Sequence, residues 1–168
     1  MTELDQVWFR MLNEATDRAD QTGRADVAEY LRLKATNDAV RTRGVNWLFD
    51  TLVEIAGRAV RLSHGLTIER DQPHNFARGS SNMVGSRLQI RHGVRCLTVE
   101  AGWARTPSDG IMNNGSLAFA RITHFGMPAA GAEIRLVHAD SLPNWLGDDG
   151  TIIDSRELAS HFDLLLGS

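Results

Sequence analysis

The chain has 168 residues, 42% hydrophobic and 23% charged, which is typical of a globular domain and excludes a disordered or fibrous chain. The formal net charge of −3 excludes a strong overall attraction to nucleic acid or anionic lipid. A single cysteine, Cys96, excludes an internal disulfide, and no apolar run approaches the roughly 18–20 residues that span a bilayer. The segment MTELDQVWFRML lacks the pattern of a secretory signal, so we expect a cytoplasmic protein.

The first third of the chain is predicted to be helical. Apolar residues recur at helical spacing from Leu4 to Ala19, and residues 21–23 are expected to break the helix. A shorter helical stretch follows, and a second long helix is predicted to begin at Asn37 or Asp38, both good N-caps, and to end near residue 62. This helix is apolar over much of its circumference, so we expect it to be covered on more than one side.

After Gly65 the apolar residues alternate with polar ones, as in strands. Strands are predicted over residues 66–70, 75–78, 82–91, 94–101, 116–125 and 133–139, with 151–154 as a short addition. Their short connections imply an antiparallel meander, because parallel pairing would need longer crossover segments. Ser155 is then expected to cap a last helix that runs through SRELASHFDLLL.

The centre of this sheet is a predicted hairpin. With His92 and Gly93 as its loop, Arg91 would lie opposite Val94. Side chains that face one way are then apolar: Leu88, Ile90, Leu97, Val99 and Ala101. Those that face the other way are mostly polar: Arg87, Gln89, Arg91, Cys96, Thr98 and Glu100. The pattern predicts a sheet with one buried and one polar face.

The expected fold is therefore α+β. N-terminal helices pack on one face of an antiparallel meander sheet of about five or six strands, and a short C-terminal helix follows. No Pro-rich or Ser-rich linker separates these parts, so residues 1–168 are interpreted as one domain with a helical part (1–65), a sheet (66–154) and a C-terminal helix (155–168).

The connection at residues 102–115, GWARTPSDGIMNNG, is the first candidate binding site. Structureless loops of about 12–15 residues are uncommon in compact domains and often bind ligands. This one offers an aromatic surface, a guanidinium and polar side chains in Trp103, Arg105, Asp109 and Asn113. The alternative is that the loop holds ordinary turn residues and that Trp103 anchors the core.

The polar sheet face is the second candidate. Arg87, Arg91 and Arg121 would line a binding surface for an anionic ligand, since Arg pairs bidentately with carboxylate and phosphate. Cross-strand Arg–Glu pairs exposed to solvent are the ordinary alternative. Single-stranded nucleic acid is a weaker option, because Phe119 and Phe125 are the only aromatic residues in these strands and both are compatible with core positions.

The histidines supply the candidates for catalysis. His124 or His138 would act as a general base beside a carboxylate such as Glu100, Asp109 or Asp140. No HExxH, CxxC, nucleophile-elbow or phosphate-binding glycine motif is present, so neither a metal site nor a cofactor is predicted.

These observations favour a binding or accessory protein over an enzyme. It would engage a protein partner or a small anionic ligand through the sheet face and the loop at 102–115. The first alternative is a small enzyme that uses a strand histidine as its base, and the second is weak nucleic-acid binding by the arginines of the sheet. A symmetric homodimer is a further option, formed by a strand at the sheet edge or by the flank of the second helix.

Overall fold

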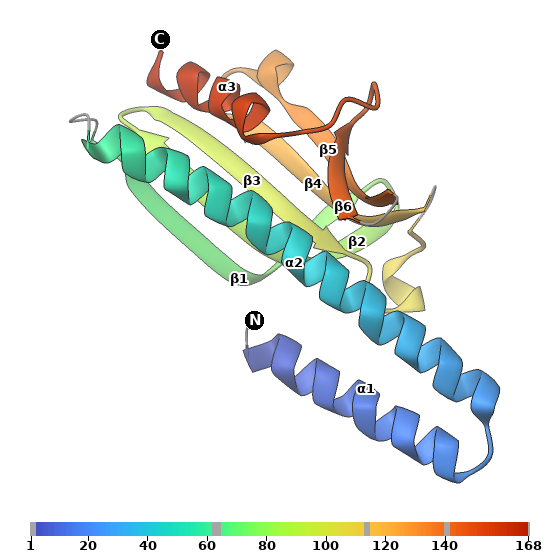
Figure 1. Ribbon diagram of the computed structural model, residues 1–168. Coiled ribbons are helices and arrows are strands. Elements are labelled where there is room, and N and C mark those ends of the chain that lie inside the picture. Colours follow the sequence, from blue (N-terminus) through green and yellow to red (C-terminus); the bar gives the residue numbers. More distant parts are fainter. Residues whose placement is uncertain (1–2, 62–64, 113–114, 140–141, 168) are drawn as a thin grey trace. The chain divides into compact units, whose positions relative to one another are not determined.

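The computed structural model describes the chain except residues 1–2, 62–64, 113–114, 140–141 and 168 (Figure 1). The chain divides into two compact units, residues 1–43 and residues 44–168. Helix α2 (Ala25–Arg61) contributes to both units. Each unit is described by itself.

The first unit is a pair of helices, α1 (Glu3–Gln21) and the beginning of α2. The predicted break at residues 21–23 is confirmed, with Gly23 at a φ of 72°. The helix start predicted at Asn37 or Asp38 is wrong, because α2 begins at Ala25 and is continuous there. Asp38 does not cap a helix: its buried carboxylate accepts hydrogen bonds from Trp8 Nε1 and Arg41 Nη1, each at 2.7 Å. The Asp38 carboxylate thus binds side chains and does not cap backbone N–H groups.

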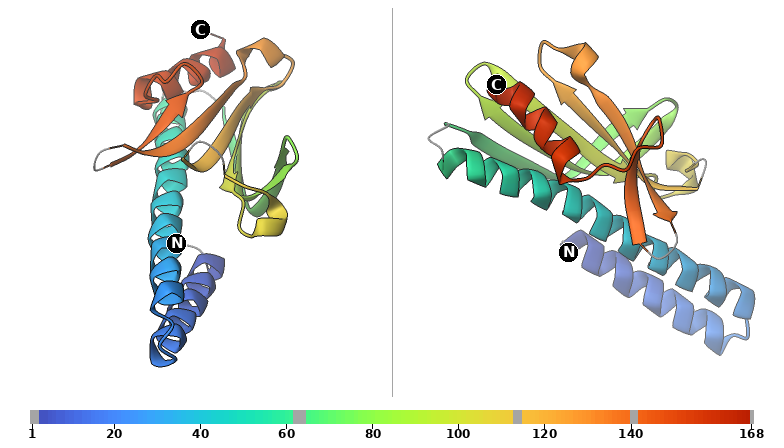
Figure 2. Two further views of the ribbon diagram at one scale, coloured as in Figure 1. Left: turned by 90° about the vertical axis from the view of Figure 1, so that its right-hand side faces the viewer. Right: turned by 45° about the horizontal axis from the view of Figure 1, so that its top comes forward.

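The second unit is an antiparallel meander sheet with helices on one face, which confirms the predicted α+β fold. Its six strands follow one another in chain order. They are β1 (Thr67–Arg78), β2 (Ser81–His92), β3 (Arg95–Trp103), β4 (Ser116–His124), β5 (Ala132–Ala139) and β6 (Leu142–Gly147). Short 3₁₀ turns, η1 (Pro107–Asp109) and η2 (Pro128–Ala130), lie in the connections around β4, and α3 (Ser155–Leu166) ends the chain. The sheet is strongly twisted (Figure 2).

The core lies between the sheet and the helices α2 and α3, which cover the same face (Figure 1). The predicted apolar face of the hairpin is confirmed as part of this core, together with Leu48 and Leu52 of α2 and Phe162 of α3. One buried polar contact ties α2 to the far edge of the sheet, where Trp145 Nε1 donates to the carbonyl oxygen of Gly44 at 3.0 Å.

The hairpin between β2 and β3 has a register two residues away from the predicted one. Arg91 lies opposite Cys96, not Val94, and His92 pairs with Arg95, so the loop is Gly93–Val94. Gly93 adopts a φ of 59°, which places it at a loop position that needs positive φ. Because side chains alternate with a period of two, this shift leaves every side chain on its predicted face.

Other elements of this unit also differ from the prediction. Residues 66–70 and 75–78 belong to one strand, β1, whose pairing shifts register between Asp71 and His74. Strand β6 was not predicted, because Pro143 argued for a turn, but a sheet edge tolerates proline. The N-cap of α3 is Asp154 instead of Ser155, and its carboxylate accepts from the backbone N–H groups of Arg156 and Glu157.

None of the helices in the described part of the chain is long and apolar enough to cross a membrane.

Candidate functional site

The sheet face opposite α2 carries a row of charged residues, one from each of five neighbouring strands. The backbone pairing aligns Asp71, Arg87, Glu100, Arg121 and Glu133, so that negative and positive charges alternate across the sheet. We call these residues the charged row. It contains three carboxylates and two guanidinium groups, and therefore has a net charge of −1 at neutral pH.

The members of the charged row pair with one another. Arg87 Nε and Nη2 donate to Asp71 Oδ2 at 2.8 and 2.5 Å. Arg121 lies between two carboxylates, 3.5 Å from Glu100 and 3.6 Å from Glu133, and its Nη2 also donates to the carbonyl oxygen of Ala77 at 2.7 Å. Arg87 and Arg121, two of the predicted anion-binding residues, thus have acidic partners within the sheet.

On one side of the charged row the same face becomes apolar. Phe76, Met83 and Phe119 form a small buried cluster, so Phe119 lies outside the main core although it is buried. His74 stacks on Phe76 with ring centroids 6.3 Å apart, and its Nε2 lies 2.7 Å from Glu100 Oε1. The carboxylate Glu100 therefore meets a histidine, but the histidine is His74 and not one of the predicted candidates.

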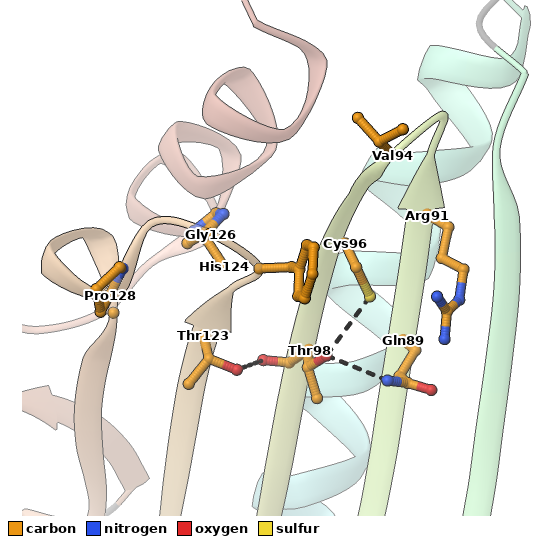
Figure 3. Close-up of a pocket in the computed structure, with 11 residues that line it drawn as sticks. Gln89, Arg91, Val94, Cys96, Thr98, Thr123, His124, Gly126 and Pro128 are labelled. Carbon is orange, nitrogen blue, oxygen red and sulfur yellow. Dashed lines mark hydrogen bonds between the residues drawn. The ribbon is translucent and has the colours of Figure 1, made fainter.

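On the other side of the charged row lies a cavity of about 660 Å³, partly open to solvent. Figure 3 shows side chains of β2 and β3 projecting into it, joined by hydrogen bonds from Gln89 to Thr98 (3.3 Å) and between Cys96 and Thr98 (3.6 Å). We call it the sheet-face pocket. Its lining residues are Gln89, Arg91, Val94, Cys96, Thr98, Thr123, His124, Phe125, Gly126, Pro128 and Gly131.

Arg91 is the arginine that lines the sheet-face pocket. It is exposed, and in the described part of the chain no carboxylate forms an ion pair with it. Of the three sheet arginines predicted to bind an anion, Arg87 and Arg121 are neutralised within the charged row, while Arg91 leaves its guanidinium available. A guanidinium of this kind presents donors that match a carboxylate or phosphate.

The predicted general bases occupy other surroundings. His124 is buried and its Nε2 lies 2.9 Å from Nδ1 of His161 on α3, not beside a carboxylate. Burial lowers the pKa of both rings, and the nearby His124 lowers that of His161 further. His138 is exposed on β5 opposite Pro143. Asp140, its proposed partner, lies outside the described residues.

The loop at 102–115 folds back on the sheet. Trp103 is only 3% exposed and belongs to the main core, and the guanidinium carbon of Arg105 lies 3.9 Å from the centre of its ring. Asp109 accepts hydrogen bonds from Asn82 and Thr106, which lower the pKa of its carboxyl group. Asn113 lies outside the described residues. The structure therefore brings Arg91, and not these loop residues, to the pocket.

Several pocket residues were missed as site candidates. Phe125 was considered compatible with the core, yet it is 75% exposed. The signal was present in the sequence, because Phe125 shares the alternation of Arg121 and Thr123 and so faces the same way. Val94 lines the pocket because it belongs to the hairpin loop.

In the portion of the chain that the structure describes, no three His, Cys, Asp or Glu side chains are grouped so that they could hold a metal ion. Comparison of the chain with protein-family models, with curated proteins and with solved structures finds no match.

Proposed function

We propose that the protein binds a small anionic molecule in the sheet-face pocket, with Arg91 as the group that recognises the negative charge. The observation that carries this proposal is the contrast between Arg91, without an acidic partner among the described residues, and the paired Arg87 and Arg121. A cavity of about 660 Å³ falls within the usual size of small-molecule sites.

Neutral hydrogen-bonding groups around Arg91 support this assignment. Gln89, Thr98 and Thr123 line the same pocket and present amide and hydroxyl groups, and no carboxylate is among the lining residues. An anion would therefore find donors and one positive charge without a competing acid in the lining. The loop at 102–115 has no part in the proposal, because the indole of Trp103 is buried.

The contact between His74 and Glu100 is the observation that favours an enzyme, because a carboxylate can orient an imidazole for general-base catalysis. Neither residue lines the sheet-face pocket. The alternative of nucleic-acid binding needs several available arginines along the sheet, and the charged row already pairs two of them. Binding of a small anion is therefore the function that the geometry supports best.

The test is an NMR titration of the ¹⁵N-labelled protein with sodium acetate and with inorganic phosphate. We expect saturable amide shifts in residues 89–98 and 123–128, on the strands and turns that form the pocket. Arg91→Gln should weaken binding at least about tenfold, because a charge-assisted hydrogen bond contributes about 1.5–3 kcal/mol.

Arg135→Gln is the matched control. Arg135 lies opposite Phe119 in the sheet, outside the pocket lining, and its replacement removes the same charge. The Arg135→Gln variant should bind acetate and phosphate with the affinity of the wild type. The proposal would be rejected if neither anion produced saturable shifts. It would also be rejected if Arg91→Gln and Arg135→Gln lost the same affinity.

A further inference from the structure

We infer that the anion bound at Arg91 carries an apolar chain, so that the ligand is an amphipathic carboxylate such as a medium-chain fatty acid. This inference rests on the proposed function and adds the chemical class of the ligand. Its basis is the division of the sheet-face pocket into a polar part and an apolar part.

The polar part lies over the strands. Gln89, Thr98 and Thr123 occupy one row of the backbone pairing, and Arg91 and Cys96 occupy the next row toward the hairpin loop. Figure 3 shows the Arg91 side chain extending along β2 toward Gln89. The negative group of a ligand would therefore lie over β2 and β3.

The apolar part lies at the end of the sheet. Val94 in the hairpin loop is 90% exposed and Phe125 at the end of β4 is 75% exposed, and both line the pocket together with Pro128. The backbone N–H of Phe125 donates to the carbonyl oxygen of Cys96 at 2.9 Å, which fixes this residue beside the polar part. Two large apolar side chains in water at the rim of one cavity are an unfavourable arrangement that an apolar ligand would relieve.

The two parts together define the ligand. A carboxylate alone would use Arg91 and leave Val94 and Phe125 in water, whereas an uncharged hydrocarbon would leave the guanidinium unpaired. A carboxylate with a chain of several methylene groups contacts both parts, and the volume of about 660 Å³ is sufficient for it.

Calorimetric titration of the whole protein with acetate, hexanoate, octanoate and octanol tests this inference. Each added methylene group that is buried should raise the affinity by about two- to fourfold, so octanoate should bind far more tightly than acetate. Octanol should bind more weakly than octanoate, because it offers no charge to Arg91.

Two matched variants locate the chain. Phe125→Ser should weaken octanoate binding about fivefold more than it weakens acetate binding, since the chain contacts the ring. Ile111→Ser is the control, because Ile111 is also 75% exposed but does not line the pocket, and it should change neither affinity.

The outcomes separate the two proposals. If acetate binds in an Arg91-dependent way and octanoate gains nothing, the amphipathic ligand is rejected and the anion site survives. If neither a carboxylate nor inorganic phosphate binds, both are rejected, whereas binding of phosphate alone rejects only the amphipathic carboxylate. Sedimentation of the protein with phosphatidylglycerol vesicles that is lost in Phe125→Ser would assign the pocket to a membrane lipid and would also overturn the inference of a free small molecule.

Discussion

His124 Nε2 and His161 Nδ1 lie 2.9 Å apart, and the two rings stack with their centroids separated by 5.2 Å. This contact joins β4 to α3. The hydrogen bond between His124 Nε2 and His161 Nδ1 holds one proton. A pair of rings with one net positive charge that keeps this hydrogen bond must therefore also carry protons on the two remaining ring nitrogens, His124 Nδ1 and His161 Nε2. One of these, His124 Nδ1, is buried and has no hydrogen-bond partner among the described residues. Charging the intact pair therefore places an N–H group where nothing accepts its hydrogen bond.

This relationship predicts that acid destabilises the folded chain. Burial lowers the pKa of both rings below the ordinary 6.5, so the unfolded chain binds protons first as the pH falls. Above about pH 6.5 the histidine pair should not change the free energy of unfolding. Below that pH the free energy of unfolding should decline as the pH falls. The slope is at most about 1.4 kcal/mol per pH unit for each ring. Urea unfolding at a series of pH values from about 8 to about 5 measures it.

Two variants test whether His124 and His161 cause this pH dependence. His124→Gln combined with His161→Gln removes both titrating rings and should flatten the dependence between about pH 6.5 and pH 5. His138→Gln replaces an exposed histidine and should leave the slope as in the wild type. A double variant with an undiminished slope would show that other groups cause the acid sensitivity.

We expect two glycine-to-alanine substitutions, at Gly85 and at Gly57, to change the free energy of unfolding in opposite directions. A Cβ atom at Gly85 would lie 1.9 Å from the carbonyl oxygen of Ala101, so Gly85→Ala must push β2 and β3 apart. We expect a loss of more than about 2 kcal/mol in the free energy of unfolding. Gly57→Ala, in helix α2 with nothing within 4 Å of the new atom, should instead gain about 0.5–1 kcal/mol. Thermal unfolding of both variants checks the opposite signs.

Two buried tryptophans differ in one hydrogen bond. Trp145 Nε1 donates to Gly44, whereas Trp103 Nε1 is buried without a partner in the described part of the chain. Trp145→Phe removes this hydrogen bond, although the carbonyl oxygen of Gly44 keeps its bond within helix α2, while Trp103→Phe removes a donor that bonds nothing. Trp145→Phe should therefore be more destabilising, by about 0.5–1.5 kcal/mol, in chemical denaturation. Equal losses would mean that packing alone governs both sites.

The charged row predicts which arginines are irrelevant to binding. Because Arg87 already pairs with Asp71, Arg87→Gln should change the affinity for acetate less than about twofold, against about tenfold for Arg91→Gln. Its effect on stability should also be small, since partly exposed ion pairs contribute about 0.2–1 kcal/mol. NMR titration and urea unfolding of the same sample give both values. An Arg87→Gln variant that loses as much affinity as Arg91→Gln would move the anion site into the row.

The polar face of the hairpin could be predicted from the sequence, because a period of two determines which side chains share a face. The register could not, since a shift of two residues leaves that pattern unchanged. Gly93 was informative only about the presence of a loop. Its position within the loop, with Val94 as the second residue, followed from the structure.

The candidate site was predicted in part. Arg91 was named together with Arg87 and Arg121, but the sequence does not reveal which of them finds a carboxylate. That depends on Asp71 and Glu133, which β1 and β5 bring into the charged row through the register of neighbouring strands. The contact between His124 and His161 joins residues 37 apart in two different elements, and no local pattern predicts it.

Cys96 offers the most direct test of the sheet-face pocket, because it is the single cysteine of the chain and lines the cavity next to Arg91. The measurement is the rate at which a small alkylating reagent modifies Cys96, followed by mass spectrometry with and without saturating octanoate. We predict that octanoate slows the reaction at least about fivefold in the wild type and in Arg135→Gln, and slows it much less at the same concentration in Arg91→Gln. An unchanged rate in the wild type, or equal protection in Arg91→Gln, would contradict an anion site at Arg91.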